Sequence, residues 1–538
     1  MSWLVALILL PLVGALVVAG LRDNDRAATL VALAVAVVEL LLVVPTWLAY
    51  DPGGERLQQV TSFDWIPALG VHVSFGIDGI ALIMIAVTAL LVPVVIGALN
   101  STDKLPEGRS AGGFLSLILV QEALTIAVFA ATDVFLFYVL FEIMLVPMYF
   151  LIGFYGGPKR QYAAVKFFLY SFLGGLIMLA SAIGAYSLAV DELGEGTFDW
   201  ATLVAVVSDA PVNTQIWLFL GFFLAFAIKA PLVPFHTWLP DAAGQAPIAV
   251  TVLLVGVLDK VGTFGFLRYS LPMFPDASAQ LAPLVLTLAV LGVIYGSILA
   301  AGQQDMKRFV AYVSIAHFGF IALGIFAFTP QATVGSATYM LNHSLATGML
   351  ILVLGIVAAR GGSTRISDYG GMFKMTPILG GMLLLGGMST LSLPGTNSFI
   401  SEFLVLLGAF DSRPVFAIIA TVGLVLAAAY VLWLYQRIMT GPVRGAALVD
   451  VSDAPAPSEG ISTNGGGGGT SEGGTATAVA PEKTETATRK TIRDLSGKEI
   501  AVLAPLVVLI IGLGFYPQPV LDTVTPSVEA TLQAVQER

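Results

Sequence analysis

Residues 214–241 read TQIWLFLGFFLAFAIKAPLVPFHTWLPD. The segment begins as an apolar run and carries a lysine, Lys229, shortly before Pro231, Pro234 and Pro240. Each proline removes a backbone donor and interrupts an α-helix. We therefore expect two half-helices that are joined by an unwound stretch, with a charged side chain at the break.

A second apolar segment, 377–410, is too long for one straight crossing. As a continuous helix it would measure about 50 Å, whereas the hydrocarbon core of a bilayer is about 30 Å thick. Pro394 and Gly395 lie in its middle and predict a second broken helix. Interrupted helices at corresponding places in two halves favour inverted repeats with an ion path near the midplane. Proline kinks without a transport role are the alternative.

The composition is that of a membrane protein. Of the 538 residues, 57% are hydrophobic and 11% charged, whereas a soluble domain has about 25% charged residues. This excludes a soluble enzyme, a nucleic-acid-binding protein and a disordered chain. The chain has no cysteine, which excludes disulfides, zinc–thiolate sites and thiolate-ligated iron–sulfur clusters. Its four histidines are too few for a haem-rich electron carrier.

About fourteen segments are long enough to cross a bilayer, which needs about 20 apolar residues each. We predict an all-α polytopic protein with spans at 2–21, 27–50, 77–99, 111–131, 134–155, 161–190, 214–239, 247–270, 280–301, 309–328, 333–359, 377–410, 414–439 and 499–517. The first span has no basic region before it and runs into charged residues, so we do not interpret it as a cleavable signal peptide.

The loops between these spans divide by charge. One side carries Arg22, Arg26, Lys104, Arg109, Lys159, Arg160, Lys307, Arg308, Arg360, Arg365, Lys374, Arg437 and Arg444, and the other carries Arg56, Arg268, Arg413 and Arg538. The positive-inside rule makes the first side cytoplasmic. An even number of spans then places both termini on the outer side.

The segment 445–498 differs from the rest of the chain. It contains five consecutive glycines, at 465–469, and is rich in Ser, Thr, Ala and Glu. Such a composition cannot bury an apolar core, so we expect a flexible cytoplasmic loop. It is either a tolerated insertion or, less simply, a docking or regulatory segment.

Ionisable side chains inside the spans are the candidate functional residues, because each charged group at the bilayer centre costs roughly 2.5–3.5 kcal/mol on insertion scales. The first group is Glu142, Lys229, Lys260, His317, His343 and Glu402, and the second group is Glu122, Asp133, His236 and Asp259. Glu, Lys and His change protonation state readily when buried. They therefore favour a proton relay.

Fixed buried ion pairs and hydrogen-bonded core histidines are the alternatives to a relay. Glu39 and Lys166 are better explained as structural residues. Asp259 cannot face the same way as Lys260, because adjacent helical residues point about 100° apart. We expect it to point towards a helix interface.

Three motifs carry a family resemblance. They are 229–242 (KAPLVPFHTWLPDA), 133–142 (DVFLFYVLFE) and 304–317 (QDMKRFVAYVSIAH). They are similar to motifs of the antiporter-like membrane subunits of respiratory complex I and of multisubunit cation/proton antiporters. The resemblance covers about residues 75–440. Glu402 favours the M-type subunits of bacterial NADH:quinone oxidoreductase, since L- and N-type subunits usually have lysine there.

The resemblance implies an arrangement and a set of roles. Residues 1–110 would form helices 1–3, 111–270 the first five-helix repeat, 280–440 the second inverted repeat, 441–498 the loop, and 499–538 the last helix and tail. Glu142 and Lys229 would form a coupled pair, Lys260 the central lysine, His317 and His343 the linking histidines, and Glu402 the exit residue. The chain departs from the family at Ala243, where many relatives have histidine.

We therefore expect a proton-translocating membrane subunit of a bacterial NADH:quinone oxidoreductase in the plasma membrane. FMN, iron–sulfur clusters, NADH and quinone would lie on partner subunits, with no cofactor or metal on this chain. Expected partners are the neighbouring antiporter-like chains L and N and membrane lipids, and no nucleic acid. The alternatives are a subunit of a multisubunit cation/proton antiporter and a membrane scaffold with fixed ion pairs.

Overall fold

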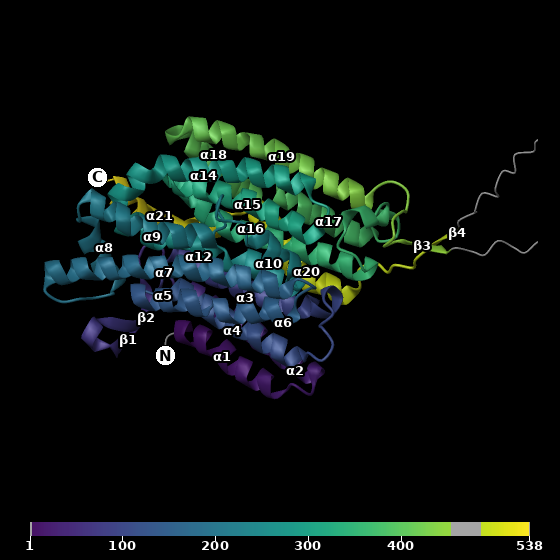
Figure 1. Ribbon diagram of the computed structural model, residues 1–538, viewed down its shortest axis with the longest axis horizontal. Coiled ribbons are helices and arrows are strands. Elements are labelled where there is room, and N and C mark those ends of the chain that lie inside the picture. Colours follow the sequence, from purple (N-terminus) through teal and green to yellow (C-terminus); the bar gives the residue numbers. More distant parts are fainter. Residues whose placement is uncertain (1–2, 453–485, 537–538) are drawn as a thin grey trace, which may run out of the picture.

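The computed structural model describes residues 3–452 and 486–536 and is an elongated bundle of helices (Figure 1). Thirteen helices in these ranges are long and apolar enough to cross a membrane. The segment 377–410 supplies a further crossing in two pieces, α17 (Pro377–Thr390) and α18 (Asn397–Ser412). The predicted all-α membrane fold with about fourteen spans is confirmed.

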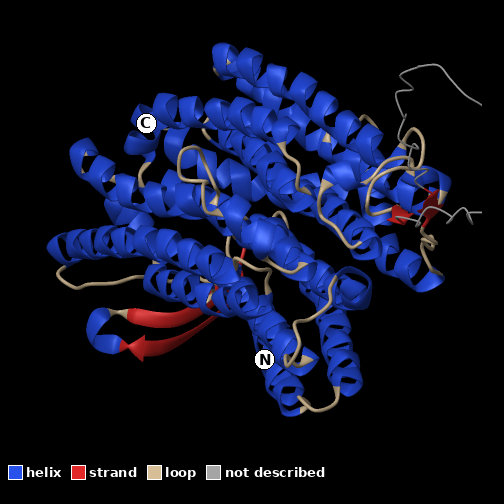
Figure 2. Cartoon of the chain, turned by 45° about the vertical axis from the view of Figure 1, so that its right-hand side comes forward, coloured by secondary structure: helices blue, strands red, loops and turns tan. Residues whose placement is uncertain are grey.

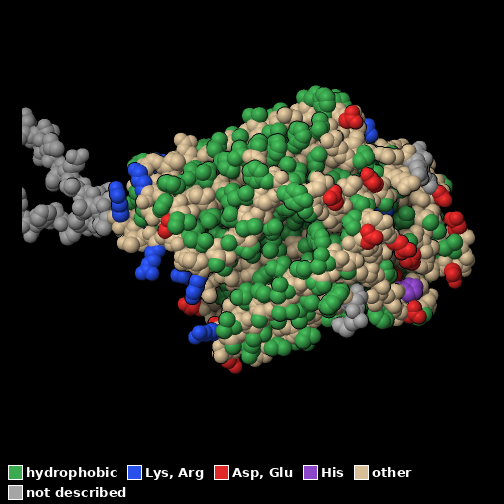
Figure 3. Space-filling model, turned by 180° about the vertical axis from the view of Figure 1, so that it is seen from behind, with side chains coloured by type: hydrophobic (Ala, Val, Ile, Leu, Met, Phe, Trp, Pro, Cys, Tyr) green, Lys and Arg blue, Asp and Glu red, His purple; other side chains and the backbone are tan. Residues whose placement is uncertain are grey.

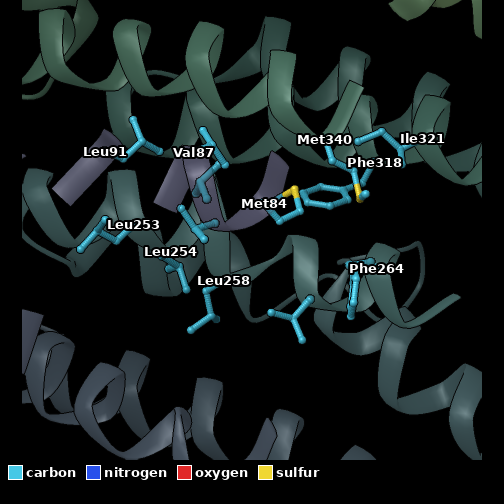
Figure 4. Close-up of a cluster of buried hydrophobic side chains, with 14 of the residues drawn as sticks. Met84, Val87, Leu91, Leu253, Leu254, Leu258, Phe264, Phe318, Ile321 and Met340 are labelled. Carbon is cyan, nitrogen blue, oxygen red and sulfur yellow. The ribbon is translucent and has the colours of Figure 1, made fainter. Parts of the chain in front are cut away.

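Three helices precede the repeats. They are α1 (Trp3–Gly20), α2 (Asp25–Leu48) and α3 (Gly79–Thr102). α1 and α2 lie at one flank of the bundle (Figure 1) and expose apolar residues along one face. α3 is apolar all round and is buried between other helices, as expected for such a helix. Figure 4 shows its Met84, Val87 and Leu91 in one apolar cluster with Leu254 and Phe318 from both repeats.

Two sets of five crossings follow. The first contains α4 (Ala111–Ala130), α5 (Val134–Ile143) with α6 (Leu145–Tyr155), α7 (Arg160–Leu193), α9 (Val212–Lys229) with α10 (Leu239–Gln245), and the helical run Ile248–Met273. The second contains α14 (Pro275–Gly302), α15 (Met306–Ile325), α16 (Pro330–Gly361), α17 with α18, and α19 (Pro414–Met439). The fourth member of each set is broken. Because each set has an odd number of crossings, the second set starts from the opposite side and is inverted.

The run Ile248–Met273 is not a regular α-helix, although the sequence predicted an ordinary span there. It consists of α11 (Ile248–Leu253), the π-helical η2 (Leu254–Leu258), α12 (Lys260–Gly265), the π-helical η3 (Phe266–Ser270) and α13 (Leu271–Met273). The amide of Asp259 donates to the carbonyl of Leu254 at 3.1 Å, which is the i→i−5 bond of a π-turn. Single π-turns within α-helices are frequent at functional sites.

The two ends of the bundle differ in charge. Figure 3 shows most of the Lys and Arg of this face at one end, most of the Asp and Glu at the other, and a broad apolar surface between them. We call these the basic end, which carries the loops with Arg22, Lys104 and Lys159, and the acidic end, which carries the loops with Glu195 and Asp209. The charge division that the sequence predicted is therefore present in the folded chain.

Arg268 corrects that assignment in one detail. The division of the loops by charge placed Arg268 in a loop on the side with few Lys and Arg residues. In the structure it lies inside η3 and is 1% exposed. Its Nη2 forms an ion pair of 2.8 Å with Asp78, which is equally buried. The partner carboxylate lies at the start of α3, which is distant in sequence, so the charges of the loops alone could not identify this pair.

Several small elements cover the ends. A hairpin of β1 (Gln58–Ile66) and β2 (Val71–Ile77), connected by η1 (Pro67–Leu69), lies at the edge of the bundle (red in Figure 2). Its Gly70 accepts a hydrogen bond from the amide of Phe198, shortly before α8 (Trp200–Ser208). The loop between α16 and α17 contains η4 (Ile366–Asp368) and η5 (Met372–Lys374). After α20 (Gly497–Phe515), α21 (Gln518–Gln536) packs on α3, α13 and α16, whereas the sequence predicted only a tail there.

The segment predicted as a flexible loop has structured flanks. β3 (Val449–Ser452) pairs antiparallel with β4 (Thr486–Arg489) at the basic end. Asp494 then accepts hydrogen bonds from the amides of Ile378 and Leu379 and so caps α17. The glycine run itself, at 465–469, lies outside the described residues.

Candidate proton-transfer pathway

The first part of the site is Glu142, near the end of α5. A glycine on α7, Gly175, leaves the space that the carboxylate fills, because a Cβ at that position would overlap Glu142 Oε1. Among the described residues neither carboxylate oxygen has a hydrogen-bond partner. The two carboxylate oxygens are therefore buried, although the residue as a whole is partly exposed, and the side chain is held by its fit against Gly175.

Lys229 is the last residue of α9 and is completely buried. Its Nζ lies 4.8 Å from the ring centre of Phe141 and 5.8 Å from that of Phe167. It has no hydrogen-bond partner in the described chain, and it interacts electrostatically with Glu142. Helix α9 ends at this lysine, as the prolines predicted.

The break after Lys229 is stabilised locally. The indole Nε1 of Trp238 donates to the carbonyl of Ile228 at 2.9 Å, which satisfies a group that the interrupted helix leaves free. At the basic end, the carboxylate of Asp241 in α10 binds Lys166 of α7 at 2.7 Å and Arg308 of α15 at 2.9 Å. These contacts explain Lys166 as a structural residue.

Lys260 is the first residue of α12, separated from η2 by Asp259 alone, and is completely buried. Its Nζ donates to the carbonyl of Val255 within η2 and lies 2.7 Å from His343 Nδ1 on α16. His343 Nε2 lies 3.2 Å from Ser314 Oγ on α15. The lysine therefore connects the last crossing of the first repeat to two helices of the second.

The second part of the site is a line of polar side chains from His343 to Glu402. The rings of His343 and His317 are 5.3 Å apart between their centres. His317 Nδ1 lies 2.6 Å from the hydroxyl of Tyr339, and that hydroxyl donates to Glu402 Oε2 at 2.8 Å. Ser392, in the break between α17 and α18, donates to the same oxygen.

An amide pair braces the second break. Asn342 Nδ2 donates to the carbonyl of Asn397 at 2.9 Å, and Asn397 Nδ2 donates back to the carbonyl of Asn342 at 3.1 Å. Ser389 donates to Asn397 Oδ1 at 2.8 Å. The start of α18 is therefore bonded directly to α16, which also carries His343, and the end of α17 is bonded to the start of α18.

Sequence reasoning missed Tyr339, Ser392 and the two asparagines. Tyr339 and His343 are four residues apart and so share a helix face, a spacing that could have suggested a link. Neutral polar residues are common in the spans of this chain, however, and only the fold brings Tyr339 between His317 and Glu402.

Three of the four second-group residues lie apart from this line. Asp133 caps α5 by accepting from the amide of Leu136, and it also accepts from the amide of His72, both at 2.9 Å. Glu122 on α4 is 1% exposed and interacts electrostatically with Glu39 rather than with the two lysines. His236 is 4% exposed and packs against the ring of Tyr295.

The fourth, Asp259, is completely buried, and in the described chain neither of its carboxylate oxygens has a hydrogen-bond partner. It interacts electrostatically with Lys229 and with Lys260. It immediately precedes α12, which packs on α9, the helix that ends at Lys229.

The chain is similar in sequence to known membrane subunits. Residues 131–427 match the model of the family described as "NADH:quinone oxidoreductase/Mrp antiporter, TM". The chain is 43% identical to NADH-quinone oxidoreductase subunit M of Mycobacterium tuberculosis, with 99% of this chain and 94% of the relative covered. It is 37% identical to the subunit M of Rhodobacter capsulatus, with 95% and 91% covered.

Solved structures agree. A chain of respiratory complex I from Thermus thermophilus superposes with a TM-score of 0.82 at 30% identity, and 99% of each chain is covered. A chain of the Mrp complex from Dietzia sp. gives a TM-score of 0.80 at 22% identity, with 99% of this chain and 100% of that chain covered. The second likeness shows a shared fold.

The fold and the buried acid–base line define an antiporter-like polytopic membrane protein. Two inverted five-helix sets each have a broken fourth member; the first holds Glu142 and Lys229, and the polar line from Lys260 to Glu402 leads into the second. The chain belongs to the family of NADH-quinone oxidoreductase M subunits, as its identity over nearly its whole length to several of them shows.

Proposed function

We propose that the chain is the proton-translocating M-type subunit of a bacterial NADH:quinone oxidoreductase. The observation that carries this proposal is the series of contacts Lys260–His343–His317–Tyr339–Glu402, in which the two histidines meet ring to ring and the other neighbours lie at hydrogen-bond distance. The similar relatives are named NADH-quinone oxidoreductase subunit M, and these names support the assignment of the chain to that enzyme complex.

In the proposed mechanism, Glu142 and Lys229 are the input. Lys229 is completely buried and Glu142 is partly buried, and neither charged group has a hydrogen-bond partner among the described residues, so the charge of each strongly affects the other. A change on a neighbouring subunit alters this pairing, and Lys229 then releases its proton towards Lys260. No bond between heavy atoms forms or breaks, so the work is electrostatic.

The proton then crosses the second repeat in three steps. An N–H bond of Lys260 breaks as an N–H bond forms at His343 Nδ1, and His343 releases a proton from Nε2 to His317 Nε2. That nitrogen has no protein hydrogen-bond partner among the described residues. His317 Nδ1 then protonates the oxygen of Tyr339 as the hydroxyl proton of Tyr339 passes to Glu402.

The redox chemistry belongs to partner subunits in this proposal. FMN, iron–sulfur clusters, NADH and quinone bind there, and this chain couples to them mechanically or electrostatically. Its membrane neighbours are the antiporter-like chains L and N, together with lipids that cover the exposed apolar flanks. The absence of cysteine supports the assignment of iron–sulfur clusters to other chains.

The proposed location is the bacterial plasma membrane with the basic end in the cytoplasm. The charge division between the two ends supports this orientation. α1 begins and α21 ends towards the side of Figure 1 that is opposite to β3 and β4, so both termini would lie outside the cytoplasm.

The second candidate is a subunit of a multisubunit cation/proton antiporter, which the likeness of fold to the Mrp complex favours. Purification of the native assembly through a tag on this chain separates the two. We expect flavin- and iron–sulfur-containing subunits to co-purify with NADH:quinone reductase activity. An assembly of membrane subunits that exchanges cations for protons without oxidising NADH would overturn the proposal.

A further inference from the structure

Asp259 occupies an unusual place for a carboxylate. It lies between η2 and α12, within the helical run Ile248–Met273, which is completely buried in the bundle. Both of its oxygens lack protein hydrogen-bond partners among the described residues. An unpaired carboxylate in a low-dielectric interior costs free energy. A purely structural role does not explain why an ionisable group is kept at this position.

The direction of its side chain follows from its neighbours on α12. Asp259 and Gly262 are three residues apart and share a helix face. Gly262 presses against the end of α9, since a Cβ there would lie 2.6 Å from both the carbonyl oxygen of Phe226 and the amide nitrogen of Ala230. Asp259 therefore faces the part of α9 where Lys229 lies.

Lys260 faces in a different direction. It is about 100° from Asp259 around the helix, and its Nζ meets His343 on α16. The two consecutive residues thus point into the two repeats, one towards Lys229 and one towards His343. The charge of Asp259 acts on both lysines.

We infer that Asp259 is a proton-transfer residue that joins Lys229 to Lys260 and thereby connects the two repeats. This inference rests on the proposed proton-translocating function. An N–H bond of protonated Lys229 breaks and an O–H bond forms on the Asp259 carboxylate. That O–H bond then breaks as neutral Lys260 regains an N–H bond, so one proton moves and no other bond changes.

The lack of a direct bond between Asp259 and either lysine distinguishes a proton-transfer residue from a fixed counter-ion. No direct hydrogen bond joins Asp259 to either lysine among the contacts of the described residues. Transfer therefore requires a water molecule or a rotation of a side chain between them. A fixed counter-ion would instead be expected to hold one lysine in a direct ion pair, as Asp78 holds Arg268.

The test uses the whole enzyme complex in native membrane vesicles with variants of this chain. Asp259→Asn keeps the shape and removes proton exchange, so we expect assembly with proton pumping and coupled quinone reduction reduced about tenfold or more. Asp259→Glu should restore a large part of both rates. NADH oxidation by a soluble artificial acceptor, which bypasses the membrane subunits, should be unchanged in both variants.

Glu39→Gln is the matched control, since Glu39 is also a fully buried carboxyl without a hydrogen-bond partner among the described residues but interacts with Glu122 instead. It should pump at the wild-type rate. Wild-type pumping by Asp259→Asn would overturn the inference, as would failure of both Asp259→Asn and Asp259→Ala to assemble, because the carboxylate would then act in folding. Lys229→Ala and Lys260→Ala decide the wider question: if both also pump normally, the proposed function itself is wrong.

Discussion

The carboxylate of Glu142 on α5 fills the space that Gly175 on α7 leaves by having no side chain. Glycine is required here for room rather than for backbone conformation, because Gly175 lies inside a long regular helix. The position of the acid that faces Lys229 is therefore determined by a residue that carries no charge and no hydrogen-bonding side chain.

Gly175→Ala should displace the Glu142 carboxylate without changing any charge. We expect the complex to assemble, because the carboxylate is the end of a flexible side chain and can rotate away. Proton pumping should fall severalfold or more, since misplacement by about 1 Å can cost a reacting group about 100-fold. Pumping in membrane vesicles measures the effect, and Gly512→Ala on α20 is the control because nothing lies within 4 Å of its added methyl group.

The coupled pair predicts a second pattern. Glu142→Gln and Lys229→Ala should each suppress both pumping and coupled quinone reduction by about tenfold or more while the complex assembles. Glu142→Asp should keep part of the activity because the charge survives. Rates of vesicle acidification and quinone reduction test this, and full pumping by Glu142→Gln would contradict the proposed relay.

Much of this arrangement follows from the sequence because its signals are local. The length of the apolar runs predicts the spans. The prolines that follow Lys229 predict the first break, and Pro394 predicts the second. The ionisable residues of the first group are recognisable because charge inside a span is costly. What could not be predicted depends on contacts between distant segments: the Arg268–Asp78 pair, the Tyr339 link and the space at Gly175. The π-turn before Lys260 has no proline to mark it.

Tyr339 provides a third prediction. Tyr339→Phe keeps the ring and removes the one hydroxyl that contacts both His317 and Glu402. We expect pumping to fall severalfold or more with normal assembly. Tyr269→Phe is the control, because it also removes a buried hydroxyl, which donates to the carbonyl of Ala131 at 3.1 Å, but lies away from the line. Its loss should cost about 1 kcal/mol of stability and leave pumping unchanged.

The loop provides a fourth prediction. Ser452 and Thr486 are paired residues at the ends of β3 and β4, so an Asn-Gly turn can connect them directly in place of residues 453–485. We expect this shortened chain to assemble and to support turnover near the wild-type rate, as measured by the content of complex in membranes and by NADH:quinone reductase activity. Failure to assemble would indicate that the deleted segment docks to another part of the complex.

The last prediction separates proton transfer from structural support at Glu402. Tyr339 and Ser392 both donate to one carboxylate oxygen, so the group could serve only to brace the break between α17 and α18. Glu402→Gln retains a carbonyl oxygen that accepts both hydrogen bonds, but it cannot carry the proton. We therefore expect intact assembly with pumping reduced about tenfold or more, and partial recovery in Glu402→Lys, since a buried lysine can also exchange a proton. If Glu402→Gln pumps at the wild-type rate in reconstituted vesicles, the carboxylate braces the helix break and the proton leaves the line before it reaches α18.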